Sequence, residues 1–176
     1  MFRQLLTPDW APDCALPQLT LAGLQERATD GIRALVIDVD RTLLPRRSTE
    51  LPPAAERWLR DASALLPIHL FSNNPSRRRI GGVSERLGLP YTIGAAKPRR
   101  GPLRRVIQEL NVPAAQVALL GDRVFTDVLV GNRLGLFTVL VKPIDARGLA
   151  NPHDRLQTWE LELAHHLAHP LWKRWP

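Results

Sequence analysis

Cysteine is almost absent from this sequence, because Cys14 is the only one among 176 residues. A single cysteine excludes an internal disulfide framework and a zinc site built from cysteines, so we expect a reducing, cytosolic setting. Long apolar runs are absent as well, since no stretch approaches the ~20 apolar residues needed to cross a bilayer. Pro8, Asp9 and Pro12 interrupt the first residues before any stretch of signal-peptide length, so we expect no secretory signal. Peripheral contact with a membrane stays compatible with this composition.

Lysine is also scarce, with three residues against 21 arginines. The planar guanidinium can donate two hydrogen bonds at once to a phosphate or carboxylate, so this bias favours such partners. The chain has a formal net charge of +7, and the excess is local. Residues 75–105 hold nine of the 24 basic residues and one acidic residue, Glu85, whereas the rest of the chain is close to neutral. The pattern predicts an anionic partner bound at one place.

Length and composition predict one domain with two decorated ends. A chain of 176 residues suits a single globular domain, and 44% hydrophobic residues are enough to build a core. We expect the single domain to cover residues 1–176. It divides into an N-terminal extension (1–33), a central core (34–145) and a C-terminal helix with a tail (152–176).

Short apolar runs alternate with amphipathic stretches through the middle of the chain. Strands are expected at residues 34–38, 68–71, 91–93, 117–120 and 137–141. Helices are expected at residues 21–26, 53–65, 76–87, 101–110, 125–134 and 152–169. Continuous apolar strands separated by helices favour a parallel sheet that is covered on both faces. The predicted fold class is therefore α/β, a three-layer sandwich with about five parallel strands.

Polar residues follow the carboxyl ends of these strands, where open α/β sheets bind ligands. They fall in four segments: Asp38, Asp40 and Thr42; Ser72 and Asn73; Lys97; and Gly121, Asp122 and Asp127. An aspartate can serve as a covalent phosphoryl acceptor. Mg²⁺ prefers oxygen ligands and takes one or two carboxylates together with substrate phosphate, and a lysine stabilises developing negative charge. The residue types suit Mg²⁺-dependent phosphoryl transfer.

These four segments resemble, in order and spacing, the motifs of the haloacid dehalogenase-like (HAD) superfamily of phosphatases. The resemblance implies a Rossmannoid fold and hydrolysis of phosphomonoesters through an aspartyl-phosphate. By this resemblance Asp38 is the nucleophile, Asp40 the general acid and base, and Ser72 and Lys97 stabilise phosphate. It also implies that Asp38, Asp122 and the Asp40 carbonyl bind Mg²⁺, with Asp127 supporting them.

A narrower likeness lies in residues 30–145. The stretches SNN (72–74), AAKP (95–98), GDRVFTDVLVGNRLG (121–135) and VLVKP (139–143) are similar to the YqeG-type HAD-IIIA subfamily, and LTPDW (6–10) to its cyanobacterial and plastid branch. That subfamily includes phosphatidylglycerophosphate phosphatases, so the likeness implies phosphatidylglycerophosphate as substrate. Arg41 departs from the Asn, Asp or Gly usual at its position, and it could pair with substrate or perturb the site.

The spacing of the motifs leaves no room for a cap domain. Asp40 and Ser72 are 32 residues apart, and Ser72 and Lys97 are 25 apart, which in each case fits one helix and one strand. An uncapped site suits a phosphate carried on something large: a protein, a nucleic-acid end or a lipid headgroup.

Three arginines are candidate substrate-binding residues, together with Thr42 and Asn73. Arg77 opens the helix after Ser72, and Arg99 and Arg100 flank Lys97, so we expect all three near the mouth of the site. We hypothesise that they bind the second phosphate of phosphatidylglycerophosphate or the surrounding anionic bilayer surface; a solvated basic face is the alternative. The tail at 172–175 (WKRW) suits either a membrane interface or docking on the domain.

Other functions are also compatible with parts of the sequence. A phosphatase of a soluble nucleotide or sugar phosphate would use the same motifs. A nucleic-acid-binding protein on a HAD scaffold is disfavoured, because the basic segment contains a single aromatic residue, Tyr91, for base stacking. A catalytically silent adaptor is disfavoured by the intact Asp38, Asp40, Lys97 and Asp122.

Overall fold

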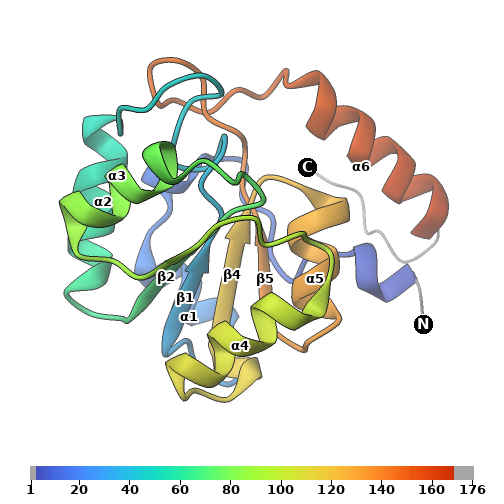
Figure 1. Cartoon of the computed structure of the whole chain (residues 1–176). Helices are drawn as coiled ribbons and strands as arrows, with labels where there is room; N and C mark the ends of the chain where they lie inside the picture. The colour runs from blue at the N-terminus through green and yellow to red at the C-terminus, as the bar shows by residue number, and fades with distance from the viewer. Residues whose placement is uncertain (1–2, 169–176) are drawn as a thin grey trace.

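The computed structural model describes residues 3–168, which form a five-stranded parallel sheet flanked by helices (Figure 1). The strands are β1 (Ala34–Ile37), β2 (Ile68–Phe71), β3 (Tyr91–Thr92), β4 (Val117–Gly121) and β5 (Phe137–Leu140). Their order is β3-β2-β1-β4-β5, so β1 is central and pairs Leu35 with Ile68 on one side and Ala118 on the other. The predicted α/β class and number of strands are confirmed.

Helices cover both faces of the sheet. They are α1 (Leu21–Arg27), α2 (Pro53–Ser63), α3 (Arg77–Leu87), α4 (Arg100–Leu110), α5 (Leu129–Asn132) and α6 (Arg155–Ala168), with shorter turns η1 (Arg3–Leu6), η2 (Leu16–Gln18), η3 (Ala114–Gln116) and the π-helix η4 (Val124–Val128). One buried apolar cluster joins α1, α2 and α3 to Leu35 and Ile37 of β1. A second joins α4 and α5 to the opposite face of β1, at Ala34 and Val36. The alternation of side chains along a strand therefore gives the predicted three layers.

The N-terminal segment is packed into the fold alongside β5. Trp10 and Ala15 form isolated parallel bridges with Val139 and Lys142. Trp58 on α2 donates its indole N–H to the carbonyl of Leu19 at 2.6 Å. These contacts pack the predicted N-terminal extension against the core, which the sequence alone does not predict.

Local sequence rules explain where α3 begins and ends. The Ser76 hydroxyl accepts a hydrogen bond from the Arg79 amide and caps the first turn. Gly88 ends the helix with a left-handed φ of 66°, which glycine adopts without a Cβ clash. The helix expected over 125–134 instead consists of η4 followed by a short α5.

The connections between the strands are short in the described residues. The segment between β1 and β2 holds α2, and the segment between β2 and β3 holds α3, so no further domain is inserted at either place within residues 3–168. Within the same residues, none of the helices has the length and apolar character needed to traverse a bilayer.

Candidate active site

The site lies at the carboxyl ends of β1, β2 and β4. Asp38, Ser72 and Asp122 each come directly after one of these strands, and β1 lies between the other two. The sheet order therefore brings three distant motifs to one edge, as the sequence predicts. Asp38, Asp40, Lys97 and Asp122 line a small pocket of about 100 Å³ at this edge.

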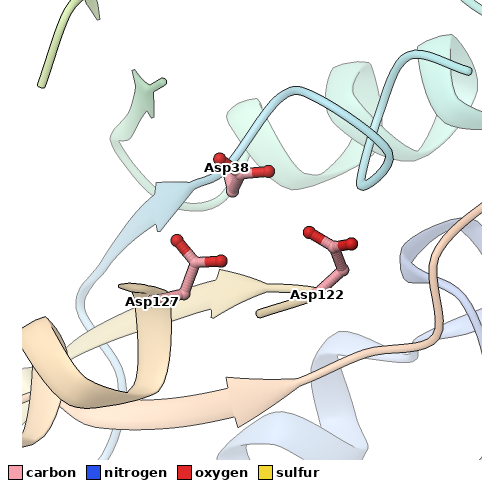
Figure 2. Close-up of side chains that lie close together, drawn as sticks. All are labelled: Asp38, Asp122 and Asp127. Carbon is pink, nitrogen blue, oxygen red and sulfur yellow. The ribbon is translucent and has the colours of Figure 1, made fainter. Parts of the chain in front are cut away.

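Three buried aspartates lie close together in the site. Figure 2 shows Asp38, Asp122 and Asp127 pointing toward one another from the ends of β1 and β4 and from η4. One carboxylate oxygen of each lies within 4.8 Å of the others, and all three residues are buried. Carboxylates gathered this closely repel one another unless cations stand between them.

Lys97 supplies one such cation. Its Nζ lies 2.5 Å from Asp38 Oδ1 and 2.6 Å from Asp127 Oδ1, and it also donates to the Phe71 carbonyl. Burial alone would lower the pKa of the Lys97 ammonium, but the charges of Asp127 and Asp38 raise it above its ordinary value. Lys97 is therefore charged at neutral pH.

Asn73 fixes the segment that carries Lys97. Its amide oxygen accepts from the Lys97 backbone N–H at 2.6 Å, and its amide nitrogen donates to the Lys97 carbonyl at 3.2 Å. Asn73 was predicted to bind substrate. In the structure its amide is engaged with the Lys97 backbone, although the residue also lines the pocket.

Asp38 is buried, and both of its carboxylate oxygens have hydrogen-bond donors. The Thr42 hydroxyl donates to Asp38 Oδ2 at 3.2 Å, while Lys97 binds the other oxygen. Burial raises the pKa of Asp38 to about 7, and the Lys97 charge opposes this rise. The Lys97 ammonium and the Thr42 hydroxyl therefore stabilise the ionised form of a carboxyl that burial alone would keep protonated.

Asp40 faces the same pocket but has different partners. Its carboxylate accepts hydrogen bonds from the Ser72 hydroxyl at 2.9 Å and from the Asn74 amide at 3.3 Å. The Arg79 Nε lies 3.0 Å from Asp40 Oδ1. Ser72, predicted to stabilise phosphate, therefore donates a hydrogen bond to Asp40 in the structure. Asn74 and Arg79 are partners of Asp40 that sequence reasoning missed.

Asp122 has the least satisfied carboxylate of the site. Arg41 Nε lies 3.1 Å from Asp122 Oδ2, yet neither carboxylate oxygen has a well-oriented hydrogen-bond donor among the described residues. Burial, followed by the charge of Asp38, raises the pKa of Asp122 well above its ordinary value. Buried carboxylate oxygens without donors are what a hard divalent cation such as Mg²⁺ requires as ligands. The residues present therefore fit a divalent metal.

Asp127 is held more firmly than Asp122. Lys97 binds Oδ1, and the Arg123 backbone N–H donates to Oδ2 at 3.2 Å. Gly121 allows this approach, because a Cβ at that position would lie 2.4 Å from Asp127 Cγ. The GDxxxxD spacing thus has a packing reason as well as a chemical one.

The helix α6 braces the segment that carries Asp122. Gln157 donates its side-chain N–H to the carbonyls of Asp122 and Val141, each at 2.8 Å. Glu160 is 1% exposed and accepts from the Arg123 guanidinium at 2.7 Å and from the Val124 backbone at 2.9 Å. Sequence reasoning missed both residues, because nothing in the amphipathic pattern of this helix indicates where its polar side chains meet the site.

Four of the five predicted substrate-binding residues do not line the pocket. Thr42 is fully buried and donates its hydroxyl to Asp38. Arg77, Arg99 and Arg100 are exposed at or next to the starts of α3 and α4, and the pocket lining does not include them. Arg41 and Arg123 line the pocket instead. Arg41, the unusual residue of the first motif, forms ion pairs with two carboxylates, Asp122 and, at 2.6 Å, Asp154.

Comparisons with known proteins show which family this chain is similar to. A family profile described as HAD-hydrolase-like matches residues 94–166. The chain is 32% identical over 127 residues to the "Probable phosphatase YqeG" of Bacillus subtilis, a match that covers 72% of each chain.

Two further proteins are similar over large parts of the chain. The chloroplastic phosphatidylglycerophosphate phosphatase 1 of Chlamydomonas reinhardtii is 27% identical over 78% of this chain, which spans about half (54%) of that protein. A crystal structure of a HAD superfamily (subfamily III A) hydrolase from Legionella pneumophila has a TM-score of 0.52 and 16% identity, covering 84% of this chain and 91% of the other, and it supports the fold. With the YqeG match extending over more than two thirds of each chain, the protein belongs to the YqeG family of HAD-superfamily phosphatases.

Proposed function

We propose that this protein is a Mg²⁺-dependent phosphomonoester hydrolase that acts through an aspartyl-phosphate on Asp38 and converts phosphatidylglycerophosphate to phosphatidylglycerol. The observation that carries the proposal is the placement of Asp38. Its buried carboxylate contacts Lys97 and has Asp122 and Asp127 as close neighbours. A nucleophile, a cation and metal ligands are thus available at one point.

The first half of the reaction transfers the phosphoryl group to the protein. An Asp38 oxygen attacks phosphorus, and the bond between phosphorus and the ester oxygen breaks. Asp40 gives a proton to the departing oxygen, so the product leaves as an alcohol. Lys97 stabilises the negative charge that develops on the phosphoryl oxygens. The Thr42 hydroxyl, which donates to Asp38, keeps the attacking carboxylate in place.

The second half restores the carboxylate. Asp40 accepts a proton from a water molecule, and the resulting oxygen attacks phosphorus. The bond between phosphorus and Asp38 then breaks and inorganic phosphate is released. Ser72, Asn74 and Arg79 hold the Asp40 carboxylate for both proton transfers.

Asp122 and Asp38 are the proposed carboxylate ligands of Mg²⁺, together with the Asp40 carbonyl, and Asp127 holds the arrangement from behind. When bound, the ion offsets the repulsion between carboxylates and phosphate. Asp122 is suited to direct ligation because neither of its oxygens has a well-oriented donor among the described residues, although Arg41 Nε lies 3.1 Å from Oδ2, whereas both oxygens of Asp127 are already hydrogen-bonded.

A lipid headgroup is the proposed source of the phosphate. Support comes from the 27% identity to phosphatidylglycerophosphate phosphatase 1 proteins of Chlamydomonas reinhardtii and Arabidopsis thaliana. It also comes from the short connections between strands, which leave the site uncapped. An uncapped site can reach a phosphate at a bilayer surface, and Arg77, Arg99 and Arg100 are the proposed contacts with that surface.

Two measurements test the proposal. Asp38→Asn should abolish Mg²⁺-dependent phosphate release, while Asp61→Asn, which removes an exposed carboxylate from α2, should leave it unchanged. A panel of phosphatidylglycerophosphate, mononucleotides and sugar phosphates should then give the highest kcat/KM for the lipid. Turnover retained by Asp38→Asn would refute the nucleophile, and a preference for a soluble ester would refute the lipid substrate.

A further inference from the structure

A second and larger cleft lies beside the catalytic pocket. Its volume is about 1300 Å³, and its walls are the loop at residues 41–48 and the segment at residues 144–156 that leads into α6. In Figure 1 both segments lie beyond the carboxyl ends of the strands. Arg41 and Arg123 line the cleft and the catalytic pocket alike, so the two spaces adjoin at these side chains.

The catalytic pocket is small, so the adjoining cleft matters for binding the rest of a substrate. Its volume of about 100 Å³ is far below the ~300–1,000 Å³ typical of a small-molecule site. It can therefore hold the phosphoryl group that is transferred and little more. The remainder of a substrate must lie outside it, and the adjoining cleft has room for that remainder.

Five arginines line the cleft, and three of them have no counter-charge. Arg41 is paired with Asp122 and Asp154, and Arg123 is paired with Glu160. Arg46, Arg47 and Arg155 form no ion pair with any side chain in the described part of the chain. Asp145 also lines the cleft, but one of its oxygens accepts the Arg147 and Leu149 amides in a tight turn.

The loop that carries Arg46 and Arg47 is held in place by the catalytic machinery. Arg79 donates to the carbonyls of Pro45 and Arg46, at 2.7 and 2.8 Å, while its Nε contacts Asp40. The facing wall is tied to the same loop, because the Ile144 amide donates to the Arg41 carbonyl at 2.7 Å. The positive side chains therefore project from a loop whose backbone is fixed relative to Asp40.

We propose that this cleft binds a second phosphate group of the substrate molecule, through Arg46, Arg47 and Arg155, while the terminal phosphomonoester reaches Asp38. Guanidinium groups donate paired hydrogen bonds to phosphate oxygens, which makes them suited to a phosphodiester. The inference rests on the proposed function and deepens it, because it explains how a headgroup with two phosphates is told from a simple phosphomonoester.

Two soluble substrates that differ in one phosphate test this proposal. Glycerophosphoglycerol phosphate is the deacylated headgroup and carries a phosphodiester and a phosphomonoester, whereas glycerol 3-phosphate carries the monoester alone. The wild-type protein should hydrolyse the first with a kcat/KM at least about tenfold higher. Arg46→Ala/Arg47→Ala should remove most of that preference by raising KM for glycerophosphoglycerol phosphate far more than KM for glycerol 3-phosphate.

A matched pair of arginines serves as the control. Arg33 lies just before β1, at the opposite edge of the sheet, and Arg57 is exposed on α2. Arg33→Ala/Arg57→Ala removes the same charge and should leave the preference intact. Equal kcat/KM for the two substrates in the wild type, or a preference that survives in Arg46→Ala/Arg47→Ala, overturns the proposal.

A binding measurement separates a failure of the cleft from a failure of the proposed substrate. One outcome is that the protein hydrolyses p-nitrophenyl phosphate but neither glycerophosphoglycerol phosphate nor glycerol 3-phosphate. This outcome counts against the proposed lipid substrate. Glycerophosphoglycerol, which carries only the diester, is then titrated by calorimetry. A Kd that Arg46→Ala/Arg47→Ala raises about tenfold supports the cleft, and equal Kd values overturn it.

Discussion

Asp122 is the residue at which stability and chemistry conflict most directly. Its carboxylate is buried without a well-oriented donor among the described residues, and its pKa is raised well above 3.8. A carboxyl with a raised pKa binds its proton more tightly in the folded than in the unfolded protein. The stability that it contributes is therefore lost as the pH rises through the folded-state pKa.

Asp122→Asn should stabilise the metal-free protein while removing its activity. The substitution eliminates a buried negative charge that Asp38 and Asp127 repel, and Arg41 keeps Asp154 as its partner, so we expect the free energy of unfolding in EDTA to rise by about 1–2 kcal/mol at about pH 8 and by less at about pH 5. Urea unfolding at the two pH values checks this, and phosphate release checks the loss of activity. A variant that is less stable than the wild type at the higher pH contradicts the expectation.

Single residues also mark the limit of what the sequence predicts. The spacing of Asp38, Lys97 and Asp122 is enough to bring them to one edge, because each follows a strand of a parallel sheet. The partners of Arg41 and Arg79 are not predictable in this way. A long, flexible arginine reaches carboxylates far along the chain. Arg41 also has a left-handed φ of 70°, which no sequence motif predicts. Which carboxylates they reach is therefore decided by the tertiary structure.

Among the elements, α6 contributes most to the site without supplying a catalytic group. Glu160 is 1% exposed and fixes Arg123 and Val124, which lie between Asp122 and Asp127 in the sequence. The ion pair is partly screened, because the Arg123 side chain is 36% exposed. The hydrogen bond from the Val124 backbone N–H to the Glu160 carboxylate is buried and positions η4 directly.

Glu160→Gln should therefore weaken both the fold and the metal site. We expect the free energy of unfolding to fall by about 2 kcal/mol, since the Arg123 charge loses its partner. The Mg²⁺ concentration for half-maximal activity should rise severalfold (roughly 3–10 fold), because Asp122 and Asp127 are less well positioned. Urea unfolding and a Mg²⁺ titration are the measurements. Glu162→Gln, an exposed change on the same helix, is the control, and equal effects of the two variants would show that Glu160 has no special role.

The elements differ in how far the sequence determines them. Continuous apolar runs such as 34–37 and 117–120 are readable as buried strands, and both are confirmed. The pairing of Trp10 with Val139 is not readable, because one bridge between residues so distant leaves no periodic pattern. The π-helical turn at 124–128 is equally hidden, since its apolar residues fit an α-helix as well.

At the scale of the whole molecule, exposed arginines lie on two separate surfaces, at the start of α4 and in the cleft. Arg99 and Arg100 are exposed at and beside the start of α4 and line neither the catalytic pocket nor the cleft. Arg46 and Arg47 line the cleft, although they lie outside the basic segment of the sequence. Net charge along the chain therefore predicts an anionic partner but not the residues that meet it.

Arg99→Glu/Arg100→Glu should weaken binding to vesicles that contain anionic lipid. Each basic residue near such a surface contributes about 1 kcal/mol, so reversing two should lower binding at least about tenfold. Vesicle sedimentation measures this, and turnover of p-nitrophenyl phosphate should not change. Reversal of Arg33 and Arg57 is the control. Unaltered vesicle binding by Arg99→Glu/Arg100→Glu would remove these residues from the proposed membrane contact.

The bracing of the site by α6 has a consequence for the order of events during synthesis. Every catalytic motif precedes Gln157 and Glu160 in the chain, so the ribosome produces the aspartates and Lys97 before the helix that fixes their loops. A domain generally folds as a unit. The catalytic geometry can therefore be completed only after α6 has been synthesised and has docked on the loop between Asp122 and Asp127.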